Sequence, residues 1–281
     1  MSCEKRILVV GGGKMGEAIL SGWIASTNQP ADGISAADIT VVEPSAERRA
    51  YLAQIHGVNC IEDISQASAA DVVVLSVKPQ VMMGMLASLA ENSAFTGGQG
   101  PRPLFITIAA GLTTEKIQAA LPEGSVLVRV MPNMALSIGE GASGVCGGKN
   151  AASEQVEYVA GLFGCLGRAV VVDEADMDAV CALSGSGPAY VAAMVEAMRD
   201  AAAAEGLDPE LAETLALQTV LGTAKLMAET DISVAQCREA VCSPGGTTLA
   251  ALDAMYAAGF NDVFQAGISA AVRRSKELAQ C

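Results

Sequence analysis

The segment RILVVGGGKMG, residues 6–16, holds a short apolar run rich in β-branched side chains that stops at three consecutive glycines. Apolar residues then recur at helical spacing over residues 15–24, so the segment predicts a strand, a tight turn and a helix. In this context the spacing Gly11-x-Gly13-x-x-Gly16 is typical of a dinucleotide-binding turn. Gly11 allows the turn, Gly13 lets a pyrophosphate approach the backbone, and Gly16 lets the helix pack on the sheet.

The helix that follows would present free amides and a positive dipole end to the phosphates, so the segment predicts binding of NAD or NADP. A glycine turn in a parallel α/β protein without this ligand is the alternative. Downstream, apolar strand patterns alternate with helical ones, which indicates a doubly wound parallel sheet of the Rossmann type. We expect strands at residues 39–42, 71–77, 104–109, 125–130 and 168–172, helices at 45–56, 81–90, 114–120 and 153–162, and a surface loop at 93–103.

The pattern changes after Asp173, where β-branched runs give way to long stretches of Ala, Leu, Met and Glu. The remainder predicts an all-helical domain. We therefore place a dinucleotide-binding Rossmann domain at residues 1–173 and a helical domain at 174–281. The expected helices cover residues 176–183, 188–205, 209–229, 234–241, 248–257 and 261–278.

Composition limits the partners and the compartment. The sequence has 17 Lys and Arg against 31 Asp and Glu, a net charge of −14, which repels nucleic acid and anionic membranes over long range. We expect neither as a partner. The eight cysteines include no C-x-x-C pair and do not cluster with the single histidine, His56, so we expect no metal site. Scattered thiols without a secretory signal or a membrane span predict a cytoplasmic protein.

Several segments follow predicted strands at the carboxyl edge of the sheet, where ligands bind in open α/β proteins. Glu43 ends the second strand, where a carboxylate accepts hydrogen bonds from the adenosine ribose and favours NADH. Arg48 and Arg49 follow, and they either reach a 2′-phosphate or lie on the solvated face of a helix. Residues 76–79, Ser-Val-Lys-Pro, follow the third strand. Lys78 either contacts the cofactor or a substrate anion, or is an ordinary solvated loop residue. Further candidates at this edge are Ala109 and Ala110, which let a nicotinamide ring approach the backbone, and Asn133, which bonds the ring or shapes the pocket.

Two stretches in the helical half combine glycines with hydroxyl side chains before a helix. They are residues 183–190, LSGSGPAY, and residues 241–248, VCSPGGTT. Each would present free backbone amides at a helix start, which suits a carboxylate. An ordinary capped loop is the alternative in both places, with Thr247 or Thr248 as the cap of the second helix.

These residues resemble the pyrroline-5-carboxylate reductase family. The segment from Val241 to Thr248, followed by Leu249 and Ala250, is similar to the family's V-x-S-P-G-G-x-T signature. Residues 11–15, 77–79, 109–111, 131–133 and 184–190 match in the family's order and spacing. The resemblance spans nearly the whole chain. Its specific signature is the one at residues 241–248.

The resemblance implies an oxidoreductase that reduces Δ1-pyrroline-5-carboxylate to L-proline with NADH or NADPH, the last step of proline biosynthesis. It implies a helical dimerisation domain that also takes the substrate, and a homodimer that can assemble into a ring of dimers. The implied substrate contacts are Ser243, Gly245, Gly246, Thr247 and Thr248, with Thr248 as the catalytic residue beside the ring nitrogen. The implied dinucleotide contacts are Val10, Gly11, Gly12, Gly13, Lys14, Met15, Glu43, Ser76, Val77, Lys78, Pro79, Ala109 and Ala110.

Two other functions compete with this one. A β-hydroxyacid dehydrogenase also joins a Rossmann domain to a helical domain, but it needs an acid or base on the second domain, commonly Lys. Lys225 is the only lysine between Asp173 and Lys276, and no asparagine lies near it at helical spacing. A non-catalytic dinucleotide-binding protein is the second competitor. We also expect a dimer from the helical half, because alanine-rich stretches allow helices to approach closely.

Overall fold

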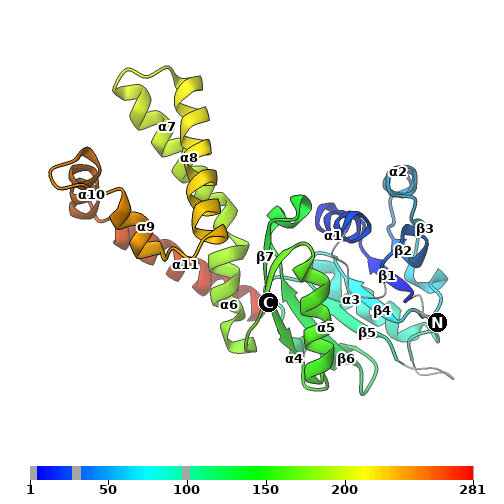
Figure 1. Ribbon diagram of the computed structural model, residues 1–281. Coiled ribbons are helices and arrows are strands. Elements are labelled where there is room, and N and C mark those ends of the chain that lie inside the picture. The colour runs from blue at the N-terminus through cyan, green and yellow to red at the C-terminus, as the bar shows by residue number, and fades with distance from the viewer. Residues whose placement is uncertain (1–4, 27–32, 97–101, 281) are drawn as a thin grey trace. The chain divides into compact units, whose positions relative to one another are not determined.

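The computed structural model describes residues 5–26, 33–96 and 102–280. By their contacts the residues form two compact units, each described here by itself (Figure 1). Unit 1 comprises Met1–Ser186 with Ala271–Cys281, and unit 2 comprises Gly187–Ala270. The boundary predicted at residue 173, between a dinucleotide-binding domain and a helical domain, stays a prediction. The contacts divide the chain after Ser186 instead.

Unit 1 is built on an eight-stranded sheet of order β3-β2-β1-β4-β5-β6-β7-β8. All neighbouring pairs are parallel except β6 with β7, which are antiparallel. The strand order reverses between β1 and β4, which makes the crevice beside their carboxyl ends the expected ligand site. The strands are β1 Ile7–Val10, β2 Ile39–Val42, β3 Asn59–Ile61, β4 Val72–Leu75, β5 Leu104–Thr107, β6 Val126–Met131, β7 Gly141–Gly147 and β8 Gly167–Val171.

Helices cover both faces of the sheet, as a doubly wound fold requires. Alternate strand residues point to opposite faces, so Ile7 and Val9 join one apolar core while Leu8 and Val10 join the other. The first core takes side chains from α1, α2 and α5, and the second from α3 and α4. Their bounds are α1 Lys14–Ala25, α2 Ala46–His56, α3 Pro79–Glu91, α4 Thr114–Ala120 and α5 Ser153–Gly164, with short turns η1 Ala36–Asp38, η2 Ile64–Gln66, η3 Met134–Ile138 and η4 Glu174–Asp176.

The structure confirms the Rossmann class and corrects two details of the sheet. The predicted strands are all present, but β3 and β7 were missed and β7 reverses the direction of the sheet. β3 has three residues, and β7 carries glycine at 141, 144 and 147, so neither gives a strong strand pattern. In the predicted loop 93–103, residues 97–101 lie outside the described part.

Unit 2 is entirely helical, as predicted for this part of the chain. Its helices are α7 Gly187–Ala204, α8 Pro209–Glu229, α9 Val234–Ala240 and α10 Thr247–Ala257, and α11 Phe260–Gln280 begins in it and ends in unit 1. Directly before α7, unit 1 contains α6 Met177–Val180 and a π-helical turn, η5 Cys181–Gly185. Among the described residues, no helix is long and apolar enough to cross a membrane.

A partly buried ion pair holds the segment that follows β8 against the sheet of unit 1. Arg129 of β6 is 3% exposed and donates from Nη1 to Glu174 Oε1 at 2.7 Å. The same carboxylate accepts hydrogen bonds from the Thr114 amide at 3.2 Å and from Cys146 Sγ at 3.1 Å. Burial and the adjacent Glu174 raise the pKa of the Cys146 thiol well above its ordinary value, so it remains a donor.

We predict that Glu174→Ala lowers the free energy of unfolding by about 3 kcal/mol, because it leaves the Arg129 charge buried without its partner. Arg129 Nε already has no hydrogen-bond partner in the described part of the chain, so there is no second acceptor in place. Urea unfolding measures the change. Glu62→Ala, which breaks the exposed pair with Arg49, is the control and should cost under about 1 kcal/mol. Equal losses in the two variants would contradict the prediction.

Candidate active site

The candidate cofactor site lies in unit 1, where the strand order reverses between β1 and β4. After β1 the backbone turns at Gly11, which has φ +106°, a conformation that favours glycine. After β4, Ser76 Oγ donates to the carbonyls of Val10 at 2.9 Å and Gly11 at 2.7 Å. Ser76 therefore holds the turn against the end of the neighbouring strand.

Close approach explains two of the glycines in the fingerprint. A Cβ on Gly11 would lie 2.9 Å from the Ser76 carbonyl oxygen, and one on Gly16 would overlap the Gly11 carbonyl. At Gly13, by contrast, a Cβ would meet nothing within 4 Å. Gly13 is exposed, so the space in front of it is open to a ligand, as its predicted role requires.

The start of α1 supplies the donors that a pyrophosphate needs. Gly13 is the N-cap and makes no side-chain capping hydrogen bond. The first intrahelical hydrogen bond runs from the Glu17 amide to the Gly13 carbonyl, so the amides of residues 14–16 precede it. These amides and the open space before Gly13 fit the phosphates of a dinucleotide.

Glu43 lies beside this turn at the end of β2. Its Oε2 accepts from the Gly12 amide at 3.1 Å and its Oε1 from the Ser45 amide at 3.0 Å, so the carboxylate is held in one orientation. The two following arginines already have partners. Arg48 donates to the Gly12 carbonyl and to Glu17, and Arg49 donates to the carbonyls of Glu43 and Pro44 and to Glu62.

The next two strand ends complete the same edge. Lys78 is exposed and is the N-cap of α3, with Pro79 at the first helical position. After β5, Ala109 is buried and Ala110 is half-buried, and both side chains are small. The structure thus brings the predicted dinucleotide residues together at the carboxyl ends of adjacent strands β2, β1, β4 and β5. They are Val10, Gly11, Gly12, Gly13, Lys14, Met15, Glu43, Ser76, Val77, Lys78, Pro79, Ala109 and Ala110.

Sequence reasoning missed the side chains behind the turn. Glu17 of α1 contacts both Arg48 and His56, and His56 Nε2 lies 2.9 Å from Glu17 Oε1. His56 is the last residue of α2, and its side chain is 15% exposed. The one signal in the sequence is that Glu17 is the single acidic residue of α1, and nothing in the spacing predicts its partners.

The predicted substrate segment lies in unit 2, between α9 and α10. Gly245 has φ +70°, and the Gly246 amide donates to the Ser243 carbonyl at 2.9 Å, so the chain turns tightly before the helix. The N-cap of α10 is Gly246, without a side-chain capping bond, so neither Thr247 nor Thr248 is the cap. The first intrahelical bond joins the Ala250 amide to the Gly246 carbonyl, which leaves the amides of residues 247–249 before it.

The second predicted carboxylate loop, residues 183–190, was wrong. The segment is not a loop before a helix: it continues from the π-helical turn η5 into α7, and the Ser186 amide donates to the Cys181 carbonyl at 2.9 Å. Its amides therefore do not form an open helix start. Pro188 explains the irregular turn, because a proline has no N–H for the carbonyl four residues earlier and its ring clashes with that group.

Asn133 supplies the hydrogen-bond donor that Pro188 lacks. The affected carbonyl belongs to Ser184, and Asn133 Nδ2 donates to it at 3.1 Å. Asn133 Oδ1 accepts from the Ala142 amide at 3.2 Å, and the side chain is 9% exposed. Both ends of this amide are thus hydrogen-bonded within unit 1, so Asn133 holds the end of η5 against the start of β7.

Lys225, the residue on which a hydroxyacid dehydrogenase would depend, lies on α8. Its side chain is 61% exposed and its Nζ is 3.7 Å from Glu229 Oε1, one turn along the helix. This is an ordinary solvated pair. The structure adds nothing that favours this competitor.

Family models match both halves of the chain. Residues 174–278 match the model for pyrroline-5-carboxylate reductase dimerisation, and residues 6–99 match the model for NADP oxidoreductase, coenzyme F420-dependent. The first match begins one residue after the division predicted at Asp173. Both agree with the motifs from which the resemblance was drawn.

Individual relatives extend this likeness over the full length. The chain is 40% identical over 273 residues to pyrroline-5-carboxylate reductase of Synechocystis sp., covering 97% of each chain. It is 38% identical over 279 residues to that of Methanosarcina acetivorans, covering 99% of each. Among solved structures, the enzyme of Coxiella burnetii matches with TM-score 0.88 and 35% identity, covering 98% of this chain and 99% of that one. The Plasmodium falciparum enzyme with NADP bound matches with TM-score 0.83 and 28% identity, covering 99% of each. The chain belongs to the pyrroline-5-carboxylate reductase family.

Proposed function

We propose that this chain reduces Δ1-pyrroline-5-carboxylate to L-proline with NADH or NADPH as the hydride donor. The observation that carries the proposal is the VCSPGGTT segment at residues 241–248, which starts α10 without a side-chain cap and matches the family signature. The dinucleotide turn in unit 1 and the full-length relatives support it. Incubation with the imine, with reduced-cofactor absorbance and proline followed together, tests it. A hydroxyacid dehydrogenase or a non-catalytic binding protein would form no proline.

The reaction needs little acid–base catalysis by protein side chains. When bound, reduced nicotinamide supplies a hydride to carbon 5 of the imine, and the ring nitrogen gains one proton to give the amine. The only histidine in the sequence is already hydrogen-bonded to Glu17, and the proposed substrate segment offers hydroxyls and amides. Catalysis then rests on holding the substrate in a reactive position and excluding water.

We assign the substrate carboxylate to the start of α10. The amides that precede the first intrahelical bond of this helix and its positive dipole end are suited to an anion. Ser243, Gly245, Gly246 and Thr247 form the turn, and the φ of +70° at Gly245 lets the backbone wrap the carboxylate. Thr248, half-buried in the first turn, hydrogen-bonds the ring nitrogen in this proposal.

We predict that Thr248→Ala lowers kcat/KM for the imine roughly ten- to a hundred-fold, the effect of losing one hydrogen bond worth ~1 to 3 kcal/mol. Cofactor affinity and thermal stability should change little, because Gly246 and not Thr248 caps the helix. Steady-state kinetics and thermal unfolding measure both. The exposed neighbour Thr247 supplies the control, since Thr247→Ala should have the smaller kinetic effect. A Thr248→Ala protein that melts lower and keeps its kcat/KM would remove the residue from the reaction.

We propose NADH as the preferred donor. The Glu43 carboxylate is held by two backbone amides at the ribose end of the site, where it can accept hydrogen bonds from ribose hydroxyls. A 2′-phosphate placed there would be repelled. The two arginines of α2 already have partners: Arg48 donates to one backbone carbonyl and a carboxylate, and Arg49 donates to two backbone carbonyls and a carboxylate.

We predict that Glu43→Ser raises the ratio of kcat/KM for NADPH to that for NADH roughly tenfold, which corresponds to about 1.4 kcal/mol of repulsion removed. Steady-state kinetics with each cofactor give the ratio. Glu47→Ser, an exposed carboxylate in the first turn of α2, is the control and should leave the ratio unchanged. An unchanged ratio in Glu43→Ser would exclude Glu43 from cofactor choice.

We further propose a homodimer formed through unit 2. Within residues 187–270 the buried side chains are Ala212, Ala216 and Cys237 alone, so this unit has almost no core of its own. Large apolar side chains remain exposed, among them Leu217 at 57%, Leu221 at 53% and Val263 at 69%. Burial against a second copy would remove this surface from water.

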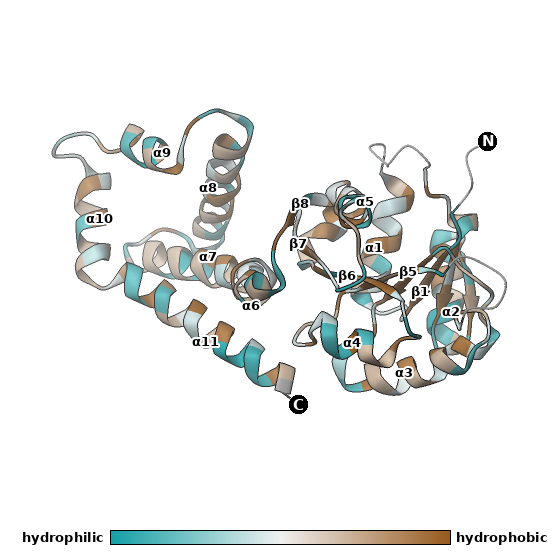
Figure 2. Cartoon of the chain, turned by 90° about the horizontal axis from the view of Figure 1, so that it is seen from below, coloured by the Kyte–Doolittle hydropathy of each residue, from teal (hydrophilic) through white to brown (hydrophobic). Residues whose placement is uncertain are grey.

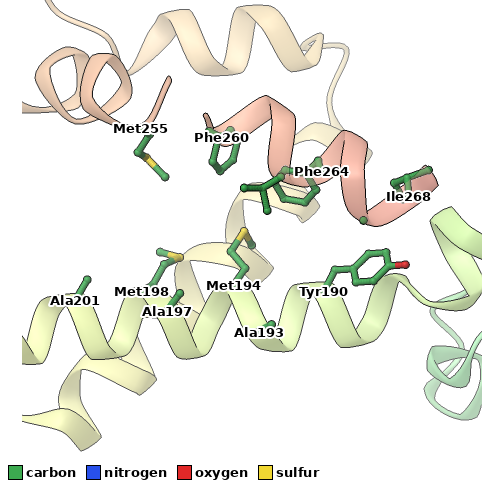
Figure 3. Close-up of a pocket in the computed structure, with 12 residues that line it drawn as sticks. Tyr190, Ala193, Met194, Ala197, Met198, Ala201, Met255, Phe260, Phe264 and Ile268 are labelled. Atoms are coloured by element: carbon green, nitrogen blue, oxygen red, sulfur yellow. The ribbon is translucent and has the colours of Figure 1, made fainter. Parts of the chain in front are cut away.

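A groove in unit 2 supports this proposal. It has a volume of about 550 Å³ and lies between α7 and the start of α11 (Figure 3). Met194 and Met198 of α7 face Phe260 and Phe264 across it. The apolar lining and the family model for dimerisation over this region support a second copy as the occupant.

We predict that the protein sediments as a dimer or larger species at low micromolar concentration, with no detectable monomer. Phe264→Asp should shift it toward monomer, because a charge in the apolar groove is costly to bury. Gln218→Asp, at an exposed polar position of α8, is the control and should sediment like the parent chain. A fully active monomeric parent would refute the dimer. Species larger than the dimer would support the ring of dimers that the family implies.

We place the protein in the cytoplasm. The six cysteines in the described part of the chain are all free thiols, which agrees with a reducing compartment.

A further inference from the structure

Side chains hold the two peptide groups on either side of Gly12, the first at both of its ends and the second at its carbonyl. The Gly12 amide donates to Glu43 Oε2, and the Gly11 carbonyl of the same peptide accepts from Ser76 Oγ. In the next peptide the Gly12 carbonyl accepts from Arg48 Nε at 2.7 Å. The N–H of a trans peptide points opposite to its C=O, so this bond fixes the direction of the Gly13 N–H.

That direction matters because Gly13 faces open space. It is exposed, and a Cβ there would meet nothing within 4 Å. Two adjacent glycines have unusual freedom to rotate, and a turn that rotates would lose its aligned amides. Arg48 is the side chain that removes this freedom from the Gly12–Gly13 peptide.

Arg48 is itself held in place by a small cluster. Its Nη2 donates to Glu17 Oε2, while His56 Nε2 contacts the other oxygen of Glu17. The Arg48 guanidinium carbon lies 4.9 Å from the centre of the Tyr51 ring. Burial works to raise the pKa of Glu17, but hydrogen bonds from His56 and Arg48 outweigh it, so the pKa lies below its ordinary value. Glu17 therefore stays a carboxylate and keeps Arg48 turned toward Gly12.

We infer that Arg48 is a positioning residue for the dinucleotide turn and not a ligand of a 2′-phosphate. The inference rests on the proposed function, since it concerns the same cofactor site. Its consequence is specific: loss of Arg48 weakens every ligand that carries the pyrophosphate, by a similar factor whether or not a 2′-phosphate is present. A 2′-phosphate ligand would instead affect NADPH alone.

The test measures dissociation constants of NADH, NADPH, ADP-ribose and AMP by calorimetry for the full chain and for Arg48→Met, which keeps an apolar stem over Tyr51. We expect the first three to bind roughly tenfold or more weakly and AMP, which lacks the pyrophosphate, to bind unchanged. Arg48→Lys should recover part of the loss, because one ammonium can still reach the Gly12 carbonyl. The control is Arg6→Met, which removes an exposed arginine at the opposite end of β1 and should change nothing.

The remaining outcomes separate the possibilities. A loss confined to NADPH would make Arg48 a phosphate ligand and overturn the inference. Unchanged binding of all four ligands would overturn it too, as would a loss of AMP affinity in step with the others and a lower melting temperature. If the parent chain binds neither NADH nor NADPH, the proposed function fails, which differs from failure of Arg48 alone.

Discussion

The close passage of the backbone between β1 and β4 is the constraint on which the cofactor site depends. At Gly11 the chain turns with φ +106° within reach of Ser76, and α1 must start at once with Gly16 against the Gly11 carbonyl. Once this path is fixed, the amides of residues 14–16 lie at an open helix start. Glu43 and Arg48 then only have to hold the two peptides around Gly12.

Unit 2 differs from unit 1 because it exposes most of its own apolar side chains. Figure 2 shows hydrophobic residues, in brown, both in the strands of unit 1 and along α7 and α8, and on these two helices many of them are exposed. Unit 2 has three small buried side chains, so a second copy that covers its apolar surface, as proposed, would stabilise it. If a second copy provides that cover, the geometry of the Ser243–Thr248 turn depends on assembly.

Most of the fold follows from local patterns in the sequence, and the errors have physical causes. The apolar runs and glycine turns predicted every parallel strand from β1 to β6 except β3, because periodicity and turn residues report local structure. The antiparallel β7 was missed because its three glycines weaken the pattern. The residues that lie at the strand ends of the site could be predicted from the sequence. Which side chains form hydrogen bonds and ion pairs with one another could not. The Asn133 bond to Ser184, the Glu17 contacts of Arg48 and the Arg129–Glu174 pair join residues that only the folded chain brings together.

Direct transfer of hydride from a reduced nicotinamide to carbon 5 of the imine is the step on which the activity of the chain depends. The most direct measurement incubates the full chain with Δ1-pyrroline-5-carboxylate and NADH that carries deuterium at both positions of nicotinamide carbon 4, followed by mass spectrometry and NMR of the product. The account predicts proline with a single deuterium, located on carbon 5. Proline that takes its new carbon-bound hydrogen from solvent, or no proline at all, would contradict it.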